Sequence, residues 1–184
     1  PIEDGLAANI RSERPVLASR ILEGKPINGA LSMVPMIFSL CGQAQSVAAV
    51  RAAESGLDME AGSNIENGRE ILIRLEALRE HLWRIFIDWP ELLGEAPRTR
   101  SFAKINQSAS ALQKMLDIDG SLTRQPGHQH WEVDEATQSA WQSLHSLVGG
   151  LMFDPSNDEG QVFPFFLLDK LVEHDWAKLG AVSS

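Results

Sequence analysis

Apolar residues recur at helical spacing along most of the chain, and the clearest case follows Ser63. Successive apolar positions there lie three or four residues apart, which places them on one helix face: Ile71, Leu75, Leu78, Leu82 and Ile85. Ser63 and Glu66 have the spacing of a capping box at the start of this helix. Trp89-Pro90 is predicted to break it, because proline lacks the N–H that a helix interior needs.

Three further helices are predicted in the C-terminal half. One extends from about Arg98 to Leu116, with this apolar face: Phe102, Ile105, Ala109, Leu112 and Leu116. After a polar loop, Asp134 is expected to cap the next helix, whose inner face is Ala140, Trp141, Leu144, Leu147, Val148 and Leu151. Residues 163–180 are predicted to form the last helix, with Pro164 near its start.

The first 57 residues give two helices and an arm. Residues 30–41 are densely apolar and read as a helix that Gly42 ends, and an alanine-rich helix follows from about Gln43 to Ser55. Residues 14–23 are predicted to form a strand or an extended arm. The fold class is therefore all-α, a helical bundle of about five to six helices with a short extended N-terminal segment. We expect one domain over residues 1–184: an arm (1–29), a first group of helices (30–94) and a C-terminal group (95–184).

The composition excludes several classes of partner and binding site. The formal net charge is −9 and no basic cluster appears, so a nucleic-acid partner is not expected. A single cysteine excludes an internal disulfide and a four-cysteine metal site. No apolar run reaches the length of a membrane span, and the first residues lack the layout of a secretory signal, so we expect a cytoplasmic protein. The chain begins with Pro1 rather than Met, which is compatible with a fragment of a longer protein.

Cys41 is the strongest chemical candidate. Free cysteine is often a buried packing residue, and from residue types alone this interpretation is preferred. The alternative is a ligand, because Cys41 precedes a predicted helix whose first N–H groups and dipole favour an anion. His81 alone reads as a hydrogen-bonded residue at the edge of a helix, and His128 and His130 as part of a solvated loop.

Residues 36–54, MIFSLCGQAQSVAAVRAAE, resemble a motif of the large subunit of nickel–iron hydrogenases, R-x-C-G-x-C-x-x-x-H followed by a helix with R-A-x-E. Aligning residues 51–54 with that tail places Cys41 on the second cysteine, Gln45 on the histidine and Phe38 on the first cysteine. The helix after Ser63 is also similar to the next helix of that family. The resemblance covers residues 30–94, half of the chain.

The departures from the motif point to a degenerate branch, the HupK/HoxV-type hydrogenase accessory proteins. A working nickel–iron site in the family uses four cysteines, two of them in a C-terminal D-P-C-x-x-C. This chain has Asp154-Pro155-Ser156 and no further cysteine. Hydrogen turnover is therefore not expected, and the chain is predicted not to be an enzyme.

The resemblance implies that Cys41 is an iron ligand, with Gln43, Gln45 and His81 lining the site. It also implies transient binding of iron with cyanide and carbonyl ligands, and no nickel. The expected partners are hydrogenase maturation proteins and the hydrogenase large subunit. An alternative stays open: a non-catalytic helical protein-interaction module that has lost metal binding.

Overall fold

The computed structural model describes residues 11, 18–157, 162–174 and 176 of the 184-residue chain. Its α-helices are α1 (Ile27–Ile37), α2 (Gly42–Leu57), α3 (Ser63–Trp83), α4 (Trp89–Leu92), α5 (Thr99–Leu116), α6 (Glu135–Phe153) and α7 (Phe163–Glu173). A π-helical segment, η2 (Arg84–Asp88), joins α3 to α4 without a break, so the described residues form six helical rods and no strand. The all-α prediction is confirmed.

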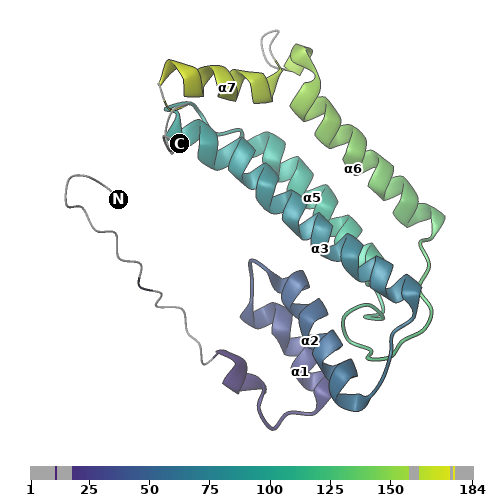
Figure 1. Ribbon diagram of the computed structural model, residues 1–184. Helices are drawn as coiled ribbons and strands as arrows, with labels where there is room; N and C mark the ends of the chain where they lie inside the picture. The colour runs from purple at the N-terminus through teal and green to yellow at the C-terminus, as the bar shows by residue number, and fades with distance from the viewer. Residues whose placement is uncertain (1–10, 12–17, 158–161, 175, 177–184) are drawn as a thin grey trace, which may run out of the picture.

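The centre of the molecule is a pair of helices, α3 and α5, which lie side by side (Figure 1). The other side of α5 contacts α6, and α7 packs against α6 at one end of the bundle. All five apolar positions predicted on α5 are buried. They join one core cluster with apolar residues of α3, η2, α6 and α7.

The predicted break at Pro90 is wrong, because the helix continues through it to Leu92. Proline cannot donate to the carbonyl of Phe86, four residues earlier. That carbonyl instead accepts the N–H of Arg98 at 2.7 Å, from the segment that leads into α5. The π-helical segment lies at this point and is one of the usual ways in which a helix accommodates an irregularity. Gly94, with φ of +75°, then ends the rod.

Helices α1 and α2 form a hairpin (residues 27–57) that packs on α3 through α2. Its own buried apolar residues are Leu31, Val34, Val47 and Val50. None of the four belongs to the core cluster of the other helices. The hairpin therefore has a small core of its own.

Several local predictions need correction. Residues 18–22 of the predicted extended arm form a 3₁₀ helix, η1 (Ala18–Leu22); residues 1–10 and 12–17 lie outside the described part of the chain. The N-cap of α3 is Gly62 rather than Ser63, because Glu66 pairs with arginines instead of completing a capping box. Trp141 is 45% exposed rather than part of the inner face of α6. Asp134 does cap α6, accepting the Thr137 N–H at 2.7 Å.

Candidate functional site

Cys41 lies in the short turn between α1 and α2, as the N-cap residue of α2. Helix α1 ends at Ile37 and Gly42 begins α2, so the prediction that Gly42 ends the first helix is wrong. Gly42 is buried against Pro35, which lies in the last turn of α1; a Cβ at Gly42 would lie 3.5 Å from it. This close approach holds the turn tight and leaves the Cys41 side chain at the surface.

The thiol of Cys41 is exposed. The interpretation of Cys41 as a buried packing residue is therefore wrong, and its side chain is accessible to a ligand or a partner. Two large apolar neighbours in the same stretch are also exposed, Met36 at 80% and Leu40 at 76%. The end of α1 and the turn therefore both expose apolar surface close to Cys41 in the chain.

The start of α2 is satisfied by a residue far away in the sequence. Glu76, on α3, accepts the N–H of Gln43 at 2.8 Å and the N–H of Ala44 at 3.0 Å. A carboxylate is well suited to this place, because it binds N–H groups that have no partner inside the helix and lies at the positive end of the helix dipole. Glu76, rather than the Cys41 thiol, therefore occupies the anion-binding position that the sequence suggested for Cys41.

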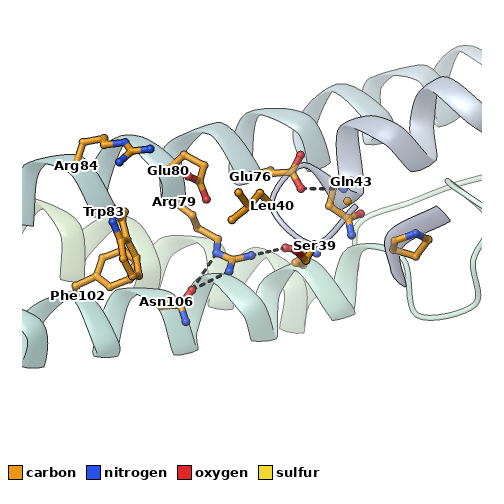
Figure 2. A pocket seen from close by; sticks show the side chains of 13 residues that line it. Ser39, Leu40, Gln43, Glu76, Arg79, Glu80, Trp83, Arg84, Phe102 and Asn106 are labelled. Carbon is orange, nitrogen blue, oxygen red and sulfur yellow. Dashed lines mark hydrogen bonds between the residues drawn. The ribbon is translucent and has the colours of Figure 1, made fainter. Parts of the chain in front are cut away.

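A cavity of about 550 Å³ opens beside this turn, between the hairpin, α3 and α5. Figure 2 shows Ser39 and Leu40 of the turn beside the α3 side chains that line it. The lining residues outside the hairpin come from α3, η2 and α5: Glu76, Arg79, Glu80, Trp83, Arg84, Phe102, Asn106 and Gln113. Leu40 and Gly42, which flank Cys41 in the chain, both line the cavity, but Cys41 itself is not one of its lining residues.

Arg79 forms the polar floor of the cavity and links α3 to α5. Its guanidinium donates to Asn106 Oδ1 from Nε at 3.1 Å and from Nη2 at 2.8 Å, and to Gln113 Oε1 from Nη1 at 3.1 Å (Figure 2). Because a guanidinium only donates hydrogen bonds, the side-chain oxygens of Asn106 and Gln113 face Arg79. The NH₂ groups of these two amides are then available to donate to other partners. The floor is therefore rich in hydrogen-bond donors.

The structure brings together only part of the predicted site. Gln43 lines the cavity. Gln45 is exposed on the next turn of α2, and His81 is exposed on α3; neither lines the cavity. His81 follows Glu80, a lining residue, by one position, which turns it about 100° around the helix axis. The prediction that His81 and Gln45 line one site with Cys41 finds no support in this geometry.

No group of three or more His, Cys, Asp and Glu side chains that could hold a metal ion exists within the described residues. The donor set near Cys41 therefore does not fit a resident metal ion held by protein ligands alone. It fits at most a group that brings its own ligands and takes one bond from the protein.

Residues 51–54, the R-A-A-E of the predicted motif, belong to a charged network between α2 and α3. Glu54 binds the fully buried Arg69 through both carboxylate oxygens, at 2.7 and 2.8 Å. Arg69 also donates to Glu66 at 2.5 Å and to the carbonyl of Leu122 at 2.8 Å. Arg51 donates to Glu66 at 2.6 Å. The two charged ends of the motif thus hold α2 on α3.

The charges in this network change the pKa values of Glu66 and Arg69. Burial alone would raise the pKa of Glu66, but hydrogen bonds from Arg51 and Arg69 outweigh it and lower the pKa. Burial would lower the pKa of Arg69, but its hydrogen bonds to Glu54 and Glu66 outweigh it and raise the pKa. Both groups are therefore ionised at neutral pH.

Sequence reasoning did not identify Glu76, Arg79 or Arg69. Each is a charged residue on α3 whose partners lie 27 or more positions away, apart from the Arg69 contacts with Glu54 and Glu66. The one available signal was the i,i+3 spacing of Glu66 and Arg69, which is typical of an exposed helix pair. That spacing does not reveal that Arg69 is buried.

The chain is similar to curated proteins that are named for hydrogenase expression or formation. It is 41% identical over 91 residues to HupV of Azotobacter chroococcum mcd 1, covering 48% of this chain and 27% of HupV. It is 36% identical over 118 residues to HupK of Azotobacter vinelandii (62% of this chain, 34% of HupK). It is 36% identical over 98 residues to HoxV of Cupriavidus necator (53% of this chain, 25% of HoxV).

These matches confirm the resemblance to HupK/HoxV-type hydrogenase accessory proteins. The matched region is about a quarter to a third of the length of these relatives. No family model and no solved structure matches the chain, so the likeness of the fold to the hydrogenase large subunit stays a prediction. No helix of the described chain has the length and apolarity to cross a membrane.

Proposed function

We propose that the chain is part of an accessory protein for the formation of nickel–iron hydrogenase, and that it carries the iron–cyano–carbonyl fragment of the metal centre on Cys41. The relatives support the accessory role, since their names describe hydrogenase expression and formation. The observation that carries the finer proposal is the exposed Cys41, whose chain neighbours Leu40 and Gly42 line a polar cavity.

The chemistry of a single thiolate suits a cargo better than a cofactor. A thiolate is a soft ligand for iron, and cyanide and carbonyl ligands on the iron would fill the positions that protein side chains leave open. One protein bond gives weak retention, which favours transfer to a client. Nickel is not expected, and in this proposal the chain performs no catalysis.

The surface around Cys41 offers a place for the client. Met36 and Leu40 are among the most exposed apolar side chains of the described chain, and both lie within five positions of Cys41. Exposed apolar residues beside a polar cavity are typical of a contact surface. We propose that hydrogenase maturation proteins deliver the cargo here and that the hydrogenase large subunit receives it.

The test compares Cys41→Ala with Ser55→Ala, a control at an exposed position of α2 outside the cavity lining, in protein purified without oxygen from cells that make hydrogenase. We expect infrared bands of bound cyanide and carbonyl in the wild type and in Ser55→Ala, and none in Cys41→Ala. The free energy of unfolding should differ by less than about 0.5 kcal/mol between the variants, because both side chains are exposed. Undiminished bands or normal hydrogenase formation with Cys41→Ala would refute the proposal.

A second candidate is a non-catalytic helical interaction module that has lost metal binding. The absence of a metal-binding cluster among the described residues and the exposed apolar turn favour it. The same infrared experiment separates the two. The interaction module predicts no bands in any variant and a loss of hydrogenase formation when Met36 and Leu40 are replaced by serine.

A further inference from the structure

The two ends of α2 are held to the rest of the molecule in different ways. At its C-terminal end, Glu54 binds Arg69 and also accepts the N–H of Gly127 at 2.9 Å. The connection that follows α2 forms two more hydrogen bonds with the loop 117–134: Gln129 Nε2 donates to the Glu60 carbonyl at 2.7 Å, and the Gly62 N–H donates to the His128 carbonyl at 3.0 Å. This end is fixed by charged and backbone contacts from several directions.

The N-terminal end of α2, which carries the turn with Cys41, is held across the cavity by Glu76. Its carboxylate accepts the N–H groups of Gln43 and Ala44. Arg51, near the middle of α2, adds a pair with Glu66 in which both side chains are about 40% exposed. An exposed pair of this kind contributes little. Among the polar contacts that hold the turn to α3, the two bonds to Glu76 are therefore the main ones.

The hairpin and the cavity floor have different sets of buried residues. The hairpin keeps its own buried apolar residues, which lie outside the main core cluster. The floor is tied together by Arg79 with Asn106 and Gln113, which joins α3 to α5 without involving the hairpin. The cavity of about 550 Å³ lies between the tip of the hairpin and this floor.

We propose that the α1–α2 hairpin is a hinged wall of this cavity, with residues 54–62 as its pivot and Glu76 as the latch that seats the Cys41 turn. When Glu76 releases the two N–H groups, the tip moves away from α3 and the cavity opens. Glu76 is thus a positioning residue: it sets where the thiol stands relative to the donor-rich floor. This proposal concerns the apo protein and does not depend on what Cys41 binds.

The experiment measures the distance between two spin labels by pulsed electron–electron resonance. One label is attached to Cys41, the chain's single cysteine, and the other to Lys104→Cys, an exposed position on α5. We expect one narrow distance in otherwise wild-type protein and a broad, longer distribution in Glu76→Ala. Glu76→Gln, which keeps one acceptor oxygen, should give a smaller change. The matched control is Glu80→Ala: Glu80 lines the same cavity one turn further along α3, and its side chain makes no ion pair with a described residue.

Hydrogen exchange distinguishes a hairpin that moves as a unit from one in which α2 unfolds. In Glu76→Ala, the amides of Gln43 and Ala44 should exchange about ten- to a hundredfold faster, since each loses a bond to a charged acceptor. The interior amides of α2 should keep their protection.

Three results would overturn the proposal: an unchanged distance in Glu76→Ala, an equal change in Glu80→Ala, or lost protection along the whole of α2. A second pair of labels, on Arg74→Cys and Lys104→Cys in a Cys41→Ser background, reports on α3 and α5 alone. A change in the distance between these two labels on adding Glu76→Ala would be a fourth result against the proposal.

Discussion

Replacing Arg69 by methionine tests how strongly the charged network holds α2 on α3. Arg69 is fully buried and donates hydrogen bonds to Glu54, Glu66 and the carbonyl of Leu122. Methionine has a similar length but no donor. The change therefore leaves the Glu54 carboxylate, which is only 6% exposed, without its cationic partner, and leaves the Leu122 carbonyl without its donor.

The expected cost is about 3–5 kcal/mol, the range for breaking a buried ion pair by removing one partner. Such a loss is a large part of the roughly 5–15 kcal/mol by which a domain is stable. The double variant Arg69→Met/Glu54→Leu removes both charges and should recover most of it, because an apolar pair has no carboxylate to desolvate. Arg74→Met is the matched control: Arg74 pairs with Glu70 on the same helix, but its side chain is 80% exposed, so we expect a loss of less than about 1 kcal/mol.

Urea unfolding followed by far-ultraviolet circular dichroism measures all four proteins. The reasoning is refuted if Arg69→Met costs no more than Arg74→Met. It is also refuted if the double variant is less stable than Arg69→Met, since the orphaned carboxylate would then not be the source of the loss.

Two other predictions concern the same helix. The pKa of Glu66 is lowered in the folded protein, because hydrogen bonds from its arginines outweigh the effect of burial. Its ionised form therefore contributes stability at neutral pH that is lost as the pH falls below roughly 4.3 and through the folded pKa, so urea midpoints of wild type and Glu66→Gln should differ at pH 7 and converge in acid. Gly68→Ala should cost about 1–3 kcal/mol, because its Cβ would lie 2.7 Å from Leu122 and 3.0 Å from Trp131, whereas Gly56→Ala, with nothing within 4 Å, should stabilise α2 by about 0.5–1 kcal/mol. Equal effects of the two glycine substitutions on the urea midpoint would contradict this.

The parts of the fold that depend on short-range periodicity could be predicted from the sequence. The apolar positions of α5 are buried as their spacing predicts, and Asp134 caps α6. The prediction failed at Pro90 because the rule is local. The Phe86 carbonyl, to which proline cannot donate, accepts the N–H of Arg98, and the residues around Pro90 do not predict that bond.

The candidate site was predictable to a smaller extent. The position of Cys41 at the entry of a helix was correct, but its exposure was not, because burial depends on what packs over the turn. Its side chain is exposed, and the turn makes its contacts through Gly42 with Pro35 and through the backbone of Gln43 with Glu76. Glu76 could not be predicted, since its partners lie 32 and 33 positions away and a glutamate on a helix is usually a solvated residue.

The R-A-A-E stretch shows why a motif and a site should be separated. The resemblance to hydrogenases rests partly on residues 51–54, yet both charged ends of that stretch are used to dock α2 on α3. The contacts that these residues make in the fold are therefore a sufficient reason for this part of the motif. In the proposed function Cys41 is the ligand, and its placement depends on contacts made by its neighbours Gly42 and Gln43. A substitution of Cys41 therefore removes the thiol, whereas a substitution of Glu76 leaves the thiol and changes the hydrogen bonds that position its turn.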